Sequence, residues 1–367
     1  MMIKNGCHIF ILLIACSSLL NANENVTDDR GVVYYNLNIH RGRMAPHVAL
    51  QAALKQDKIT GVDLNAIFLN RNEATLKSSV AGVGYFMSNL GNNEVYGHVH
   101  AAYFSMLFPL LTNKYPVQLK LGMGPGYVTK KHDPENNHLN RAVGSHLNVY
   151  GQISLTGGIP IIEERLLLRI GMSFNHVSNG LVVAPNQGIN TLTIHSGLDL
   201  SSNHRHSGAL SVGQDMKEKE KNCFAIMFAS GIKEVDKTAG KKIFTSSLIF
   251  DYGYRILPAV NAGIGINVFY NDTWAYDPYM SPDIDEPPVP IQSAIHLVME
   301  LDKNPVAIIL NPGFYIYKPT RNIPDFTGRL GVRYSFRNNL SIMFAIKHHW
   351  FALADYFEWG IGYRVFR

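Results

Sequence analysis

Segments of about ten residues in which apolar and polar side chains alternate recur along most of the chain. In residues 261–270 every even-numbered position is apolar or aromatic, whereas positions 261, 263, 265 and 267 carry Asn or Gly. Residues 328–336 repeat the pattern, with Arg, Gly and Ser at the odd-numbered positions. A period of two is that of a β-strand, which turns successive side chains to opposite faces. One face is apolar and tipped with aromatic residues and the other is polar, as in strands that separate lipid from a polar lumen.

A closed barrel is the sheet that such strands form in a bilayer, because every backbone N–H and C=O group needs a partner there. No internal apolar run approaches the roughly 20 residues that a transmembrane helix needs. The sequence therefore predicts an all-β fold, a closed antiparallel transmembrane β-barrel of roughly 14 strands, with 12 or 16 as alternatives because two candidate segments are weak. The candidate segments are 32–40, 59–69, 81–88, 95–105, 116–127, 142–156, 163–178, 190–200, 222–233, 243–255, 260–270, 291–301, 305–317, 328–336, 340–350 and 357–366.

The N-terminus has the features of a secretion signal. Lys4 precedes a mostly apolar stretch, residues 8–20, that is too short to span a bilayer, and Ala22 is a small residue suited to cleavage. We therefore expect residues 1–22 to be a signal peptide and residues 23–367 to form a single barrel domain in the outer membrane of a Gram-negative cell. An alternative stays open, because Leu13-Ile14-Ala15-Cys16 resembles a lipoprotein processing box that would leave a lipidated Cys16.

Charge and cysteine usage exclude other classes of function. The formal net charge is +5, but no long basic run and no nucleic-acid-binding motif is present, so we expect no nucleic acid partner. Beyond the signal, Cys223 is the one cysteine that is certain to remain. A single cysteine supports neither a disulfide framework nor a thiolate metal site. We expect no metal ion and no other cofactor.

The strongest local signal is the stretch Phe174-Asn175-His176-Val177-Ser178-Asn179-Gly180. His176 and Ser178 continue the apolar face of segment 163–178, and residues i and i+2 on one face lie about 6.5 Å apart, so the imidazole can lean toward the hydroxyl. Asn190 starts the next segment on its apolar face. If the two strands pair as a hairpin, Asn190 sits across from Ser178 and near His176. Polar groups on a lipid-facing wall need a reason, because leaving them unsatisfied in hydrocarbon is costly.

These residues fit a carboxyl-ester hydrolase. Ser178 would be the nucleophile, His176 would take its proton and later protonate the leaving alcohol, and Asn190 would hold the imidazole tautomer. The backbone N–H after Ser178, with Asn179 and Gly180 in support, would stabilise the oxyanion. The alternative is that His176 and Ser178 are ordinary residues of the membrane interface, which a His-x-Ser pair alone would favour.

The stretch 176–180, followed by Pro185-Asn186-Gln187-Gly188-Ile189-Asn190, resembles the lipid A 3-O-deacylase (acyloxyacyl hydrolase-like) family of outer-membrane barrels. That family carries His-x-Ser-Asn, a Pro-Asn-x-Gly turn and then an acidic third member. The resemblance implies a serine esterase that removes an acyl chain from a membrane lipid, with lipid A or lipopolysaccharide as the substrate. Asn190 stands at the acidic position, which keeps a hydrogen bond to the imidazole but removes a charge. The match is close only over about 170–190, and the strands after residue 200 have no assigned role.

A second resemblance is to outer-membrane phospholipase A, which also carries Asn-His-x-Ser-Asn-Gly and uses Asn as its third member. Its members follow the glycine with an arginine that helps to bind calcium, and Leu181 occupies that place here. Two alternatives to a lipid A deacylase therefore remain. One is a phospholipase A that cleaves phospholipid, and the other is a barrel without catalysis, either a pore or a structural protein.

Overall fold

The structure is a computed structural model that describes residues 32–69, 80–111, 114–162, 165–201, 222–236, 240–257, 260–273, 289–303, 305–319, 323–350 and 353–366. The expected signal peptide, residues 1–22 with Cys16, lies outside these residues.

The described residues contain sixteen strands and one short helix. The first eight strands are β1 (Val32–Met44), β2 (Ile59–Leu69), β3 (Val80–Asn89), β4 (His98–Leu111), β5 (Val117–Val128), β6 (Leu147–Ile162), β7 (Leu166–Ser178) and β8 (Ile189–Ser201), with helix α2 (Ala49–Leu54) between β1 and β2. The other eight are β9 (Asn222–Asp236), β10 (Lys241–Leu257), β11 (Val260–Asn271), β12 (Ile291–Lys303), β13 (Val306–Tyr317), β14 (Phe326–Ser335), β15 (Leu340–His349) and β16 (Leu353–Phe366).

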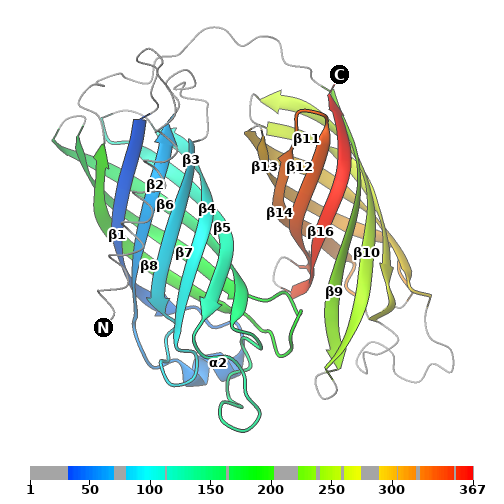
Figure 1. Ribbon diagram of the computed structural model, residues 1–367, viewed down its shortest axis with the longest axis horizontal. Coiled ribbons are helices and arrows are strands. Elements are labelled where there is room, and N and C mark those ends of the chain that lie inside the picture. Colours follow the sequence, from blue (N-terminus) through cyan, green and yellow to red (C-terminus); the bar gives the residue numbers. More distant parts are fainter. Residues whose placement is uncertain are drawn as a thin grey trace. The chain divides into compact units, whose positions relative to one another are not determined.

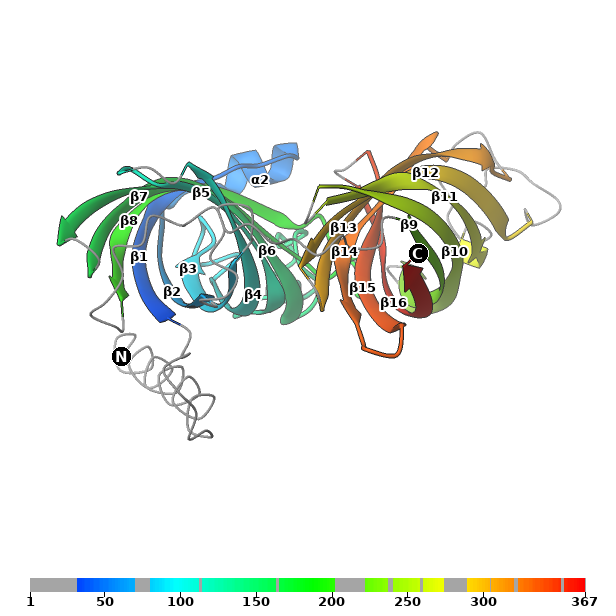
Figure 2. The same ribbon diagram turned by 90° about the horizontal axis from the view of Figure 1, so that it is seen from above.

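These strands close into two barrels, β1–β8 and β9–β16. Figure 1 shows the two sets of strands, and Figure 2 shows from above how each set winds around its own interior. The predicted fold class, a closed all-β barrel, is confirmed. The sixteen strands match one of the two alternatives to the count of fourteen. The single barrel expected for residues 23–367 is corrected to two barrels of eight strands.

Closure is set by pairing between strands that are far apart in the sequence. β8 pairs with β1 from Tyr34↔Ser201 to Met44↔Thr191, which ends the first barrel after eight strands. β16 returns to β9 from Glu358↔Gly231 to Phe366↔Cys223, which closes the second. Alternation within a segment predicts a strand, but it says nothing about which distant strand will complete the hydrogen-bonding ring.

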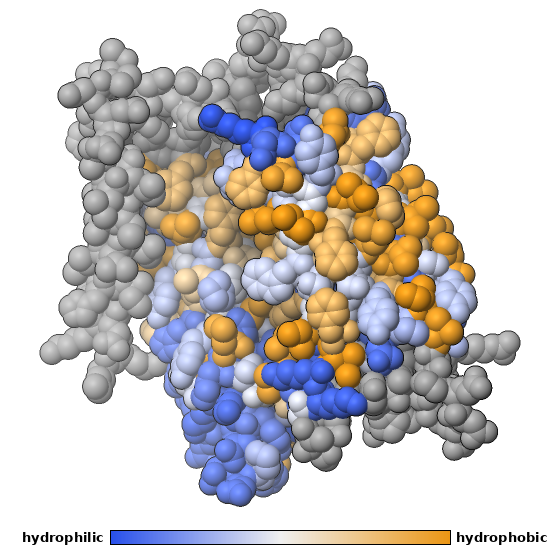
Figure 3. Space-filling view, turned by 45° about the vertical axis from the view of Figure 1, so that its right-hand side comes forward, coloured by the Kyte–Doolittle hydropathy of each residue, from blue (hydrophilic) through white to orange (hydrophobic). Residues whose placement is uncertain are grey.

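The outer walls of both barrels are apolar. In β8, Leu192, Ile194 and Leu198 are exposed, with Ile194 reaching 68% exposure, and in β9 Phe224 and Phe228 are about half exposed. Figure 3 shows one face, on which apolar side chains gather across the middle and hydrophilic side chains lie toward the lower end. An exposed apolar band of this kind is the surface that a barrel presents to lipid.

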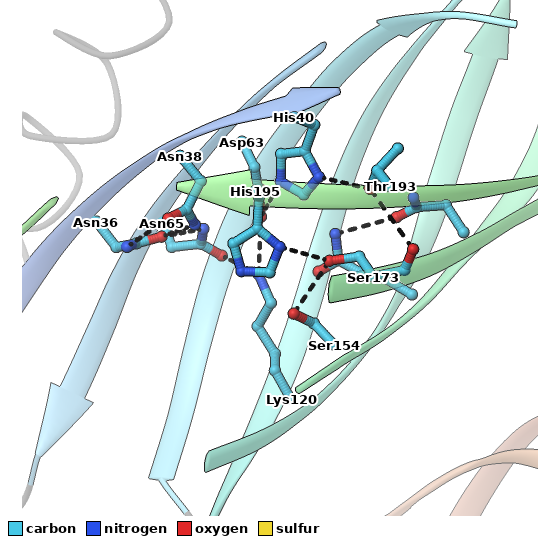
Figure 4. Close-up of polar contacts among 12 residues, drawn as sticks. Asn36, Asn38, His40, Asp63, Asn65, Lys120, Ser154, Ser173, Thr193 and His195 are labelled. Carbon is cyan, nitrogen blue, oxygen red and sulfur yellow. Dashed lines mark hydrogen bonds and ion pairs between the residues drawn. The ribbon is translucent and has the colours of Figure 1, made fainter. Parts of the chain in front are cut away.

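The lumen of the first barrel is filled by polar side chains that bond to one another (Figure 4). The buried Asp63 carboxylate accepts hydrogen bonds from Lys120 Nζ at 2.8 Å and from the Tyr103 hydroxyl at 2.5 Å. The rings of His40 and His195 stack with centroids 4.8 Å apart. An eight-stranded barrel is just wide enough for side chains to fill it, so this interior is a packed polar core.

The lumen of the second barrel carries paired charges. The Glu300 carboxylate lies between two guanidinium groups, 2.6 Å from Arg333 Nη2 and 2.5 Å from Arg364 Nη2. The buried Asp355 carboxylate lies 2.6 Å from Lys347 Nζ. A buried side chain stays charged in such an interior only when an opposite charge offsets the free energy cost of removing it from water.

The connections of the first barrel differ between its two ends. Because neighbouring strands run in opposite directions, the connections 45–58, 90–97, 129–146 and 179–188 share one end, with α2 among them (Figure 1). At the opposite end, the connections 112–116 and 163–165 are shorter, and the connection 70–79 has ten residues. Among the described residues, no helix has the length and apolar character needed to cross a membrane.

Candidate functional site

The hairpin of β7 and β8 places His176 directly opposite Asn190. Both residues continue outward-facing rows, since Met172 and Phe174 precede His176 on β7 and Leu192 follows Asn190 on β8, all three exposed. His176 and Asn190 therefore lie on the outer face of the barrel, which is the face that the alternation of apolar and polar residues predicts. The expected partner is corrected, because Asn190 lies across from His176 and not from Ser178. The difference arises because Val177 already pairs with Ile189, one residue earlier than the predicted strand start.

The two opposed side chains are hydrogen bonded, with His176 Nδ1 2.6 Å from Asn190 Oδ1. An amide oxygen can only accept, so Nδ1 carries the proton and donates. In the neutral imidazole the other nitrogen, Nε2, then carries the lone pair and can act as a base. This is the tautomer that a hydrolase with a serine nucleophile requires.

Ser178 follows His176 by two residues and is the last residue of β7. Its side chain is buried, with 2% exposure, whereas His176 is partly exposed. The strand therefore carries the predicted nucleophile and base on neighbouring positions of one face at the end of the barrel wall.

The loop after Ser178 is held by the side chain of Asn179. The Asn179 backbone N–H donates to Asn186 Oδ1 at 2.9 Å, and its Nδ2 group donates to Ser145 Oγ at 3.0 Å and to the Val183 carbonyl at 2.8 Å. Gly180 then turns the chain with a φ of +60°, which glycine adopts without strain. Asn179 thus orders the loop in this structure, and the oxyanion role of Asn179 and Gly180 stays a prediction.

A fourth polar residue, His47, contacts the site. His47 lies between β1 and α2, and its Nδ1 is 3.2 Å from Asn190 Nδ2. An amide nitrogen donates, so His47 Nδ1 accepts this hydrogen bond. His47 belongs to no sequence motif and stands 143 residues before Asn190, so no local pattern in the sequence points to it.

A different pairing of serine with histidine lies in the lumen of the first barrel. Ser173 Oγ is 3.1 Å from His195 Nδ1 (Figure 4). Thr156 Oγ1 is 3.1 Å from His195 Nε2. Ser173 and His195 are buried at 1% and 4% exposure. Both imidazole nitrogens already have partners, and the pair faces the lumen, not the lipid-facing wall, so it lacks an available base on the side where a lipid ester would lie.

Among the described residues, no group of three or more His, Cys, Asp or Glu side chains is arranged to hold a metal ion.

The closed barrels with apolar outer walls and polar interiors define the class of this protein, an outer-membrane β-barrel of the Gram-negative type. Each barrel also matches a known family. Residues 60–199 match "Lipid A 3-O-deacylase (PagL)", and residues 222–367 match "Acyloxyacyl hydrolase, C-terminal domain", which confirms the resemblance found in the sequence.

Several solved outer-membrane barrels are similar to parts of this chain. Neisserial surface protein A (NspA) is 9% identical with a TM-score of 0.31, over 46% of this chain and 96% of its own. A mutant of the Rh. blastica porin is 10% identical with a TM-score of 0.18, over 91% of this chain and 99% of its own. No curated protein sequence matches the chain.

Proposed function

We propose that this protein is a lipid A deacylase that hydrolyses an ester-linked acyl chain, with the 3-O position named by its family as the first candidate. The observation that carries the proposal is the hydrogen bond from His176 to Asn190 on the outer wall, two residues before Ser178. It makes Nε2 the basic nitrogen of the ring, beside a serine at the edge of an apolar, lipid-facing surface.

The reaction follows from these roles. Ser178 Oγ attacks the ester carbonyl carbon while its proton passes to His176 Nε2. The bond between the carbonyl carbon and the sugar-side oxygen breaks, and His176 returns the proton to that oxygen, which leaves as an alcohol. Water then attacks the acyl-serine while His176 Nε2 takes its proton. The bond between the acyl carbon and Ser178 Oγ breaks, His176 returns the proton to Oγ, and the free fatty acid departs. Asn190 Oδ1 orients the imidazole and stabilises the imidazolium in both steps.

The position of the site along the barrel supports lipid A as the substrate. His176 and Asn190 lie at the end that carries the connections 45–58, 90–97, 129–146 and 179–188. In outer-membrane barrels, the longer loops face the cell exterior and short turns face the periplasm. The site then faces the outer leaflet, and a substrate lipid can reach Ser178 by lateral diffusion in that leaflet.

The test is hydrolysis by the purified full-length protein in mixed micelles. The released fatty acid is measured by mass spectrometry with lipid A and, separately, with phosphatidylethanolamine. We expect a hydroxy-fatty acid from lipid A, and its loss in Ser178→Ala. Ser173→Ala is the matched control, because Ser173 lies on the same strand but points into the lumen. A heat-dependent shift in gel migration checks that each variant is folded.

Each outcome separates the alternatives. Hydrolysis that is confined to phospholipid would replace the deacylase with a phospholipase A, for which the Asn190 third member is the supporting feature. Ion conductance in planar bilayers, without hydrolysis of either lipid, would indicate a pore. Activity that survives in Ser178→Ala would reject the assigned nucleophile.

A further inference from the structure

We propose that His47 is a positioning residue of the hydrolase, which fixes the orientation of the Asn190 amide. This inference rests on the proposed function. It extends the site from three residues to four, because hydrogen bonds join His176 to Asn190 and Asn190 to His47.

The need for such a residue follows from the chemistry of an amide. Asn190 has two unlike ends, an oxygen that accepts and an NH₂ group that donates. If the amide flipped, Nδ2 would face His176 Nδ1 and would favour the imidazole tautomer that carries its proton on Nε2. That tautomer cannot take a proton from Ser178, so a flipped amide switches off the base.

His47 selects the productive orientation. Asn190 Nδ2 donates to His47 Nδ1 at 3.2 Å while Asn190 Oδ1 accepts from His176 Nδ1 at 2.6 Å. A flipped amide would turn Oδ1 toward His47 and Nδ2 toward His176, and both contacts could be kept only if both imidazole rings changed tautomer.

The backbone around His47 is anchored independently of its ring. The Ala45 N–H donates to the Asn190 carbonyl at 2.8 Å, and Nε2 of Gln51, which is buried in α2, donates to the Gly188 carbonyl at 2.8 Å. These bonds tie the segment before and after His47 to the start of β8. The hydrogen bonds of Ala45 and Gln51 therefore hold the exposed His47 imidazole near Asn190, and a substitution at His47 leaves both bonds in place.

The experiment is a cycle of variants at His47 and Asn190, measured with lipid A in the micelle assay. His47→Leu removes the acceptor, and His47→Asn restores one, because Asn Oδ1 stands at the same distance from the backbone as His Nδ1. We expect kcat to fall about 3- to 10-fold in His47→Leu, the range that one lost hydrogen bond implies, and to return close to the wild type in His47→Asn. KM should stay unchanged, because His47 acts through Asn190 and not on the lipid.

The discriminating step uses Asn190→Asp, in which either carboxylate oxygen can accept from His176, so no orientation needs to be selected. In this background His47→Leu should leave kcat unchanged. Equal kcat in the wild type and His47→Leu would overturn the inference, and so would an equal loss in the Asn190→Asp background, which would mean that His47 acts in another way. A wild type that releases no fatty acid would instead refute the proposed function and, with it, this role.

Discussion

Replacing Asn190 by Asp should increase the rate of hydrolysis. The two side chains have the same shape, so the carboxylate keeps the 2.6 Å contact with His176 Nδ1. It adds a negative charge beside the imidazole, which becomes positive when it takes the proton of Ser178 in the transition state. A charge that helps only when the imidazolium forms raises kcat.

The size of the gain follows from the distance and the surroundings. Two unit charges about 4 Å apart attract by about 1 kcal/mol in water and about 4 kcal/mol near a protein surface. His176 and Asn190 are both partly exposed on the outer wall at the end that carries the connection 179–188, so the lower value is the minimum gain that we expect. A gain of about 1 kcal/mol corresponds to an increase in kcat of about fivefold.

The measurement is single-turnover release of fatty acid from lipid A by the wild type and Asn190→Asp. Asn93→Asp is the control, because it adds the same charge to an exposed loop at the same end of the barrel. A kcat for Asn190→Asp at or below the wild-type value, in a folded protein, would refute the idea that Asn190 acts on the imidazolium. An equal rise in Asn93→Asp would assign the effect to net charge alone.

Two further predictions concern stability. Asp63→Ala leaves the Lys120 ammonium buried without its carboxylate partner. It should lower the free energy of unfolding by about 3–5 kcal/mol, measured by urea titration with refolding into vesicles. Replacing both residues by apolar ones should recover much of this loss. Ile194→Arg puts a charge on the lipid-facing wall and should cost about 2–4 kcal/mol in the same titration; a cost near zero would mean that β8 does not face hydrocarbon at Ile194.

Much of the fold can be read from the amino-acid sequence. Each of the sixteen predicted segments overlaps an observed strand, because lipid and lumen impose opposite preferences on alternate residues of every strand. The same rule placed His176 and Asn190 on the outer wall. The turn 185–188 between them indicated a hairpin, so these two members of the site could be found from a stretch of the chain that folds locally.

Other features depend on contacts that no local pattern contains. The division into two barrels is decided where β8 meets β1 and β16 meets β9, and these strand pairs look like any others in the sequence. The register of β7 with β8 depends on the Val177↔Ile189 pair and moves Asn190 from Ser178 to His176. The contact of His47 with Asn190 exists because closure of the first barrel brings the end of β1 beside the start of β8. Alternation reports which side of a strand meets lipid, whereas closure and register are settled by hydrogen bonding between whole strands.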